Sequence, residues 1–124
     1  MTKILIVEDD EALRDVYKEE FEHEGFEVGT ANDGQEGIDK IASYKPDLIL
    51  LDILMPKKSG FDVLKARQEN AEFKEIPVIV MTNIIANSQD LIQNWGVSHV
   101  LLKVDYTPGQ LVQKVRELLE LLKK

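Results

Sequence analysis

The fold is decided by two stretches, Ile4-Leu5-Ile6-Val7-Glu8-Asp9-Asp10 and its later counterpart Leu48-Ile49-Leu50-Leu51-Asp52. Each is a short apolar run that ends in acidic residues, which is typical of a strand buried on both faces. Carboxylates that follow two parallel strands lie in the crevice where an open α/β sheet places its ligand. Crowded carboxylates repel each other unless a cation or a proton intervenes. The pattern therefore indicates an oxygen site for a hard divalent cation.

Apolar runs of this kind alternate with helix-period segments along the whole chain. The strands are expected at Lys3–Val7, Phe26–Ala31, Leu48–Leu51, Val78–Met81 and His99–Leu102. Five strands that alternate with helices predict an α/β fold of the (βα)₅ type, with a parallel sheet covered on both faces. Because the chain is too short for an eight-stranded barrel, we expect a doubly wound three-layer sandwich.

Capping residues mark where the five helices begin and end. Asp10 is expected to cap the first helix, and Asn32-Asp33-Gly34 marks the start of the second, which Pro46 ends. The third follows Ser59-Gly60, the fourth spans Ser88–Trp95 before Gly96, and the fifth follows Thr107-Pro108. Helical periodicity predicts these core-facing residues: Leu13, Val16, Tyr17 and Phe21; Ile38, Ile41 and Ala42; Phe61, Leu64 and Arg67; Leu111, Val112, Val115, Leu118, Leu119 and Leu122.

Composition limits the classes of function. The 124 residues suit one domain, 1–124, and we expect no effector domain after it. With 15 basic and 23 acidic residues the net charge is −8, which argues against direct nucleic-acid binding and against docking to an anionic membrane. There is no cysteine, and we find neither a signal peptide nor an apolar run of membrane-spanning length. A cytoplasmic protein is expected.

Four polar residues follow strands and belong to one crevice if the sheet is doubly wound. They are Asp9, Asp52, Thr82 and Lys103. Carboxylates together with a phosphate suit Mg²⁺, and a hydroxyl and an ammonium can bind the remaining phosphoryl oxygens. A carboxylate can itself be the nucleophile, and phosphoryl transfer needs mainly positioning and charge neutralisation.

The chain resembles the response-regulator receiver (CheY-like) family over its whole length. The matching segments are Ile4–Glu11, Leu50–Pro56 with Gly60, Val78–Thr82 and Leu102-Lys103. The resemblance implies the flavodoxin-like strand order 2-1-3-4-5. It also implies that Asp52 accepts a phosphoryl group, that Glu8, Asp9, Asp52 and the Leu54 carbonyl hold Mg²⁺, and that Thr82 and Lys103 read the phosphorylated state.

The same resemblance implies a signalling function. The protein would be a phosphorylation-controlled switch of a two-component or phosphorelay system, and not an enzyme beyond its own phosphorylation and slow dephosphorylation. A histidine kinase or phosphotransfer protein would supply the phosphoryl group from a phosphohistidine, and a downstream protein would be the output partner.

Several positions depart from the family pattern. Val104 follows Lys103 where the family has a proline with a cis peptide, so we expect either a trans bond or a strained one. Val100 stands where the family often has an aromatic residue that rotates inward on activation, so this part of the switch is missing or is relocated to Tyr106. Asn83 stands where the family prefers a small residue. Leu54 and Ile84, two residues beyond Asp52 and Thr82, are apolar and cannot orient a hydrolytic water, so we expect a long-lived aspartyl phosphate.

Other functions remain as alternatives. A pseudo-receiver, which is an interaction module or scaffold that is not phosphorylated, is compatible with Val100, Val104 and Asn83. A haloacid-dehalogenase-like phosphohydrolase would need a second acid where the chain has Leu54. In a flavodoxin, Glu8-Asp9-Asp10 would repel the phosphate of the cofactor.

Overall fold

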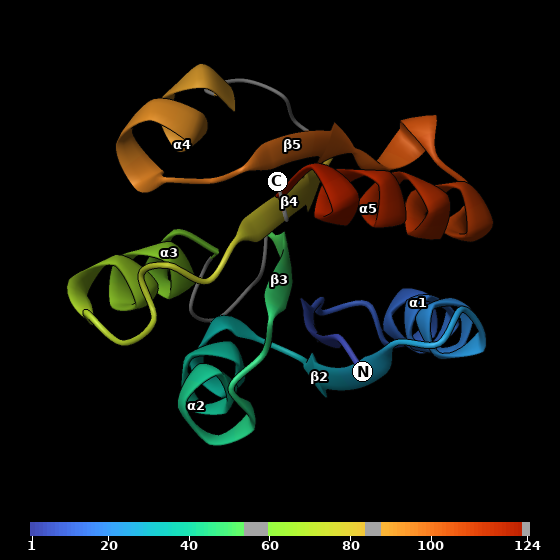
Figure 1. The fold of residues 1–124 in the computed structure, drawn as a ribbon, viewed down its shortest axis with the longest axis horizontal. Helices are drawn as coiled ribbons and strands as arrows, with labels where there is room; N and C mark the ends of the chain where they lie inside the picture. The colour runs from blue at the N-terminus through green and yellow to red at the C-terminus, as the bar shows by residue number, and fades with distance from the viewer. Residues whose placement is uncertain (54–59, 84–87, 123–124) are drawn as a thin grey trace.

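A parallel β-sheet forms the centre of the molecule. The structure is a computed structural model that describes residues 1–53, 60–83 and 88–122. Within these ranges the strands are β1 (Lys3–Val7), β2 (Glu27–Ala31), β3 (Leu48–Asp52), β4 (Val78–Thr82) and β5 (His99–Leu102). They are all parallel and lie in the order β2-β1-β3-β4-β5 (Figure 1). The predicted sheet and its order 2-1-3-4-5 are confirmed.

Helices cover both faces of the sheet. In the described part of the chain they are α1 (Glu11–His23), α2 (Gly34–Tyr44), α3 (Gly60–Glu69), α4 (Ser88–Trp95) and α5 (Pro108–Leu122), with a short 3₁₀ turn, η1 (Lys103–Asp105), after β5. Figure 1 shows α1 and α5 on one side of the sheet and α2, α3 and α4 on the other. This is the doubly wound three-layer sandwich that the alternation of segments predicts.

Each face of the sheet has its own apolar core. Successive side chains of a strand point to opposite faces, so each strand contributes to both cores. Leu50 of β3 belongs to the core that contains α1 and α5, whereas its neighbour Leu51 belongs to the core that contains α2, α3 and α4. Both leucines are fully buried, which explains why the central runs Ile4–Val7, Leu48–Leu51 and Val78–Met81 are apolar at every position.

The predicted caps of three helices are present. The Asp10 carboxylate accepts a hydrogen bond from the Leu13 amide at 3.1 Å, and the Asp33 carboxylate accepts one from the Glu36 amide at 2.8 Å. The Thr107 hydroxyl accepts one from the Gln110 amide at 3.2 Å. Gly96, after α4, has a φ of +69°, the left-handed conformation expected of a residue that ends a helix. Element bounds agree with the prediction to within one residue.

The predicted core faces are partly wrong. Val16, Phe61 and Leu122 have exposed fractions of 41%, 38% and 42%, and Ala42 is exposed as well. In α1 the stripe of residues spaced four apart that includes Tyr17 and Phe21 is the one that packs inward, and Val16 lies 100° away from it. Phe61 instead contacts Trp95 edge to face across α3 and α4, with ring centroids 6.1 Å apart.

No helix in the described ranges is long and apolar enough to cross a membrane.

Candidate functional site

The carboxyl ends of four strands bring the predicted site residues to one edge of the sheet. Glu8 and Asp9 directly follow β1, Asp52 and Thr82 are the last residues of β3 and β4, and Lys103 follows β5. Because β3 lies between β1 and β4, Asp52 is central in this group.

Three carboxylates form a compact cluster at this edge. One oxygen each from Glu8, Asp9 and Asp52 lies within 4.8 Å of the others. Glu8 and Asp52 are almost completely buried, with exposed fractions of 1% and 4%, whereas Asp9 is exposed. Negative charges this close need a cation between them, so the donor set matches the oxygen ligands that Mg²⁺ prefers.

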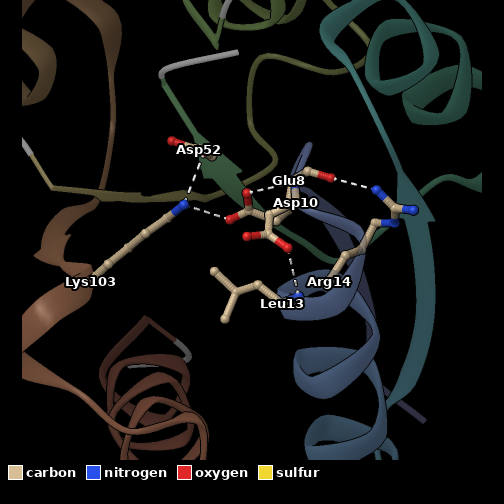
Figure 2. Close-up of polar contacts among 6 residues, drawn as sticks. All are labelled: Glu8, Asp10, Leu13, Arg14, Asp52 and Lys103. Atoms are coloured by element: carbon tan, nitrogen blue, oxygen red, sulfur yellow. Dashed lines mark hydrogen bonds and ion pairs between the residues drawn. The ribbon is translucent and has the colours of Figure 1, made fainter. Parts of the chain in front are cut away.

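Lys103 bridges two of these carboxylates, as Figure 2 shows. Its Nζ lies 2.6 Å from Oε1 of Glu8 and 3.0 Å from Oδ2 of Asp52. The resemblance predicted Lys103 near Asp52 but did not predict its shorter contact with Glu8. Glu8 therefore has two roles, as a candidate metal ligand and as the carboxylate that holds the ammonium of Lys103.

Burial and the neighbouring charges have opposite effects on the pKa of Glu8, and also on the pKa of Lys103. Burial raises the pKa of Glu8 to about 7, although Lys103 partly opposes the rise. Burial also acts against the charged form of Lys103, but the hydrogen bonds and negative charges of Glu8 and Asp52 outweigh it and raise the pKa of the ammonium. Lys103 is therefore cationic at neutral pH and supplies the positive charge in this pocket.

The turn from β1 into α1 is held by several hydrogen bonds. The Asp10 amide donates to Oε2 of Glu8 at 3.2 Å, and the Leu13 amide donates to Asp10. Nη1 of Arg14 donates to the backbone carbonyl of Glu8 at 2.9 Å (Figure 2). Arg14 is not among the site residues predicted from the sequence. The available signal was a basic residue in the second turn of a helix that directly follows the acidic strand end.

The loop after β3 is closed at its base by backbone contact. The amide of Gly60 donates to the carbonyl of Ile53 at 3.0 Å. A Cβ on Gly60 would lie 2.6 Å from Cα of Ile53 and 2.8 Å from the carbonyl oxygen of Asp52, which no side chain can accommodate without a backbone shift. Glycine is needed here so that the chain can return close to Asp52.

The remaining predictions on the site have mixed outcomes. Thr82 is buried at the end of β4, with an exposed fraction of 2%. The peptide bond between Lys103 and Val104 is trans, and Val104 is 74% exposed. Tyr106 is half-buried against the core under α1 and α5, and its part in a switch stays a prediction. Leu54 and Ile84 lie outside the described residues.

Comparison with known proteins shows the family to which this arrangement belongs. Residues 4–116 match the response regulator receiver domain. The chain belongs to this family. Receiver domains are phospho-accepting signalling modules of two-component systems that interact with histidine kinases, and they are not enzymes in the usual sense. The phosphohydrolase and flavodoxin alternatives are thereby set aside.

Two curated relatives show how this receiver domain compares in length with longer regulators. The chain is 39% identical to the transcriptional regulatory protein CpxR of Escherichia coli K12, over 96% of this chain and 50% of that protein. It is 34% identical to the DNA-binding regulator RpaA of Synechocystis, over 96% of this chain and 49% of that protein. The chain thus spans about half the length of these relatives.

Solved receiver structures superimpose on the chain over nearly its full length. The response regulator TrrA of Thermotoga maritima, solved in complex with Mg²⁺ and BeF, is 33% identical with a TM-score of 0.80, over 95% of this chain and 99% of that one. A CheY-like receiver domain of Methanospirillum hungatei is also 33% identical, with a TM-score of 0.84 over 99% and 98% of the two chains. The acidic cluster of Glu8, Asp9 and Asp52 is typical of the Mg²⁺ site of such domains.

Proposed function

We propose that this receiver domain is a phosphorylation-controlled switch whose phosphoryl acceptor is Asp52, and that it acts in the cytoplasm, where receiver domains typically occur. One observation carries the proposal: the buried carboxylate of Asp52 lies at the centre of the sheet edge, within 4.8 Å of two other acids and 3.0 Å from the ammonium of Lys103. The proposed donor is the phosphohistidine of a histidine kinase or of a phosphotransfer protein.

The proposed reaction is a displacement at phosphorus. A carboxylate oxygen of Asp52 forms a new P–O bond while the P–N bond to the donor imidazole breaks, and the released imidazole nitrogen takes up a proton. The product is an aspartyl phosphate that adds roughly two negative charges to the site. Asp52 suits this role because β3 holds its backbone rigidly and the core below it excludes water from one side.

The residues present fit a divalent cation. Glu8, Asp9 and Asp52 would hold Mg²⁺, and we propose the Leu54 carbonyl as a fourth oxygen ligand from the chain. When bound, Mg²⁺ neutralises charge on the phosphoryl oxygens. Support comes from TrrA, the relative of this fold that was solved in complex with Mg²⁺ and BeF.

Lys103 and Thr82 are the proposed readers of the phosphorylated state. Lys103 already contacts Asp52, and a phosphoryl group on Asp52 would offer its ammonium new oxygens in place of the carboxylate. The Thr82 hydroxyl, at the neighbouring strand end, would bind another of these oxygens. Such rearrangements would bias a two-state surface around α4, β5 and α5, to which a downstream protein binds.

Small-molecule phosphorylation followed by mass spectrometry tests the proposal. Acetyl phosphate with Mg²⁺ should add one phosphoryl group to the protein, and the Asp52→Asn variant should gain none. Asp47→Asn is the matched control, because Asp47 precedes the same strand at the opposite edge of the sheet. It should be phosphorylated like the wild type. Phosphorylation of Asp52→Asn to the wild-type extent would contradict the choice of Asp52.

The alternative is a pseudo-receiver that binds partners without being phosphorylated. It is favoured by Val100, Val104 and Asn83, which depart from the usual residues for communication with the surface. The same experiment separates the two functions, since a pseudo-receiver gains no mass in its wild-type form.

A further inference from the structure

We infer that Arg14 is a positioning residue for the proposed metal site: it orients the peptide between Glu8 and Asp9 and so directs the carboxylate of Asp9 into the acidic cluster. The inference rests on the proposed function, because it concerns the same Mg²⁺ site. It assigns a role to a residue on α1 that is itself neither a ligand nor a reactant.

The geometry of Arg14 connects the first turns of α1 to the end of β1. Its backbone amide donates to the Asp10 carbonyl at 2.8 Å, which places it in the regular helix. Its half-buried side chain reaches back, and Nη1 donates to the Glu8 carbonyl at 2.9 Å (Figure 2). On the other side of the same residue, the Glu8 amide donates to the Ala31 carbonyl of β2 at 3.0 Å. The backbone of Glu8 is thus held by the sheet at its amide and by Arg14 at its carbonyl.

Asp9 depends on this support more than the other two acids do. Glu8 is buried and its carboxylate is held by Lys103 and by the Asp10 amide, and Asp52 is buried at the end of β3. Asp9 is exposed, and in the described part of the chain no hydrogen bond or ion pair holds its carboxylate. The peptide is planar, so a bond to the Glu8 carbonyl also sets the direction of the Asp9 amide and the position of its Cα. Arg14 is therefore the contact that fixes the backbone from which the Asp9 carboxylate extends into the acidic cluster.

Charge and position predict opposite effects for the loss of Arg14. The guanidinium is a positive charge 2.9 Å from the Glu8 carbonyl, at the acidic end of β1, so its charge alone opposes the binding of a divalent cation there. If Arg14 acted only through its charge, a neutral residue in its place would bind Mg²⁺ more tightly. If Arg14 acts by orienting the peptide, the neutral residue binds Mg²⁺ more weakly.

Calorimetric titration of the full chain with Mg²⁺ shows whether the loss of Arg14 weakens or strengthens Mg²⁺ binding. For Arg14→Met we expect the Kd to rise about tenfold, the lower end of what the loss of a ligand-orienting contact costs. Arg14→Lys should give an intermediate Kd, because an ammonium can still donate to the Glu8 carbonyl. The matched control is Arg116→Met: Nη2 of Arg116 donates to the Glu24 carbonyl at 2.8 Å, at the far end of α1. Its Kd should equal that of the wild type.

A double-mutant cycle tests whether Arg14 acts through Asp9. In an Asp9→Asn background, Arg14→Met should change the Kd far less than it does in the wild type. The inference would be overturned by equal effects of Arg14→Met on the Kd in both backgrounds. It would also be overturned if the Arg14→Met protein bound Mg²⁺ as tightly as the wild type, or more tightly. In either case the proposed metal site would stand. A wild type that binds no Mg²⁺ would overturn the proposed metal site as well. If Arg14→Met fails to fold, Arg14→Lys tests the orienting contact at constant charge, and an unchanged Kd for that variant would overturn the inference.

Discussion

At the scale of single residues, the site is organised around one ammonium held between buried acids. Lys103 has a side-chain exposure of 14%, and its partners Glu8 and Asp52 have 1% and 6%. Ion pairs with so little solvent around them are hardly screened, and the loss of one member leaves the others as uncompensated buried charges. Lys103 thus stabilises the domain as well as contributing to the proposed phosphorylation chemistry.

Replacement of Lys103 by methionine should lower the free energy of unfolding by about 3 kcal/mol in the absence of divalent cations, because Glu8 and Asp52 lose their counter-ion. Mg²⁺ should restore part of the loss, since it returns positive charge to the same carboxylates. Urea denaturation with and without Mg²⁺ measures both effects. Lys114→Met is the control: Lys114 lies on the surface of α5, 3.7 Å from Glu117, and its loss should cost less than about 1 kcal/mol. Equal stability of the two variants would contradict the prediction.

At the scale of elements, the contact between α3 and α4 depends on polar groups at the end of α4. A helix leaves its last carbonyls without partners inside the helix. Nη1 and Nη2 of Arg67 donate to the carbonyls of Trp95 and Gly96 at 3.3 and 3.5 Å, and Nε donates to the Ile76 carbonyl before β4 at 2.7 Å. Burial lowers the pKa of Arg67. One side chain therefore ties α3 to both α4 and the start of β4.

Arg67→Met should lower the free energy of unfolding by about 2–3 kcal/mol, because it removes a charged donor from three partly buried hydrogen bonds. The C-terminal turn of α4 should also lose protection in amide hydrogen exchange relative to α1, because α4 loses contacts with Arg67 and α1 has none to lose. Gln68→Met is the comparison variant. Gln68 is exposed and donates to the Asn94 carbonyl at 3.0 Å, so its replacement should cost less than about 1 kcal/mol. If Arg67→Met lowers the free energy of unfolding only slightly, or leaves amide hydrogen exchange in α4 unchanged, the contact between α3 and α4 depends on apolar packing instead.

At the scale of the whole molecule, one sheet couples two cores that do not touch each other directly. The core with α1 and α5 and the core with α2, α3 and α4 are both built on the same strands. Neither core can be lost without exposing the apolar side chains of β1, β3 and β4 on that face. The described part of the chain should therefore unfold as a single cooperative unit.

Leu50→Ala and Leu51→Ala test this coupling with neighbouring residues on opposite faces. Each should lower the free energy of unfolding by about 3 kcal/mol, because both side chains are fully buried and truncation leaves a cavity. Both variants should still unfold in one transition, with circular dichroism and the fluorescence of Trp95 coinciding. Leu121→Ala, at a residue that is 62% exposed, should change stability by less than about 0.5 kcal/mol. A two-step unfolding curve for either core variant would contradict the coupling.

Local patterns were sufficient to predict most of the architecture. Strand and helix bounds follow from runs of apolar residues and from caps such as Asp10, Asp33 and Thr107, which act within three residues of their own position. The helix faces were less reliable, because the edge of a core-facing stripe depends on the neighbouring elements. Val16 and Leu122 fit the helical period and are nevertheless exposed.

The sequence by itself determined the fold class, the strand order through the family resemblance, and the residue types at the sheet edge. Only the tertiary structure decided which of those residues touch. The bond from Lys103 to Glu8 joins residues 95 positions apart and exists because Lys103, after the outer strand β5, reaches back past the carboxyl ends of β4 and β3 to the end of β1. The bond from Arg14 to the Glu8 carbonyl depends on the angle at which α1 leaves β1. Periodicity and capping are properties of neighbouring residues, whereas these contacts depend on how separate elements pack in space.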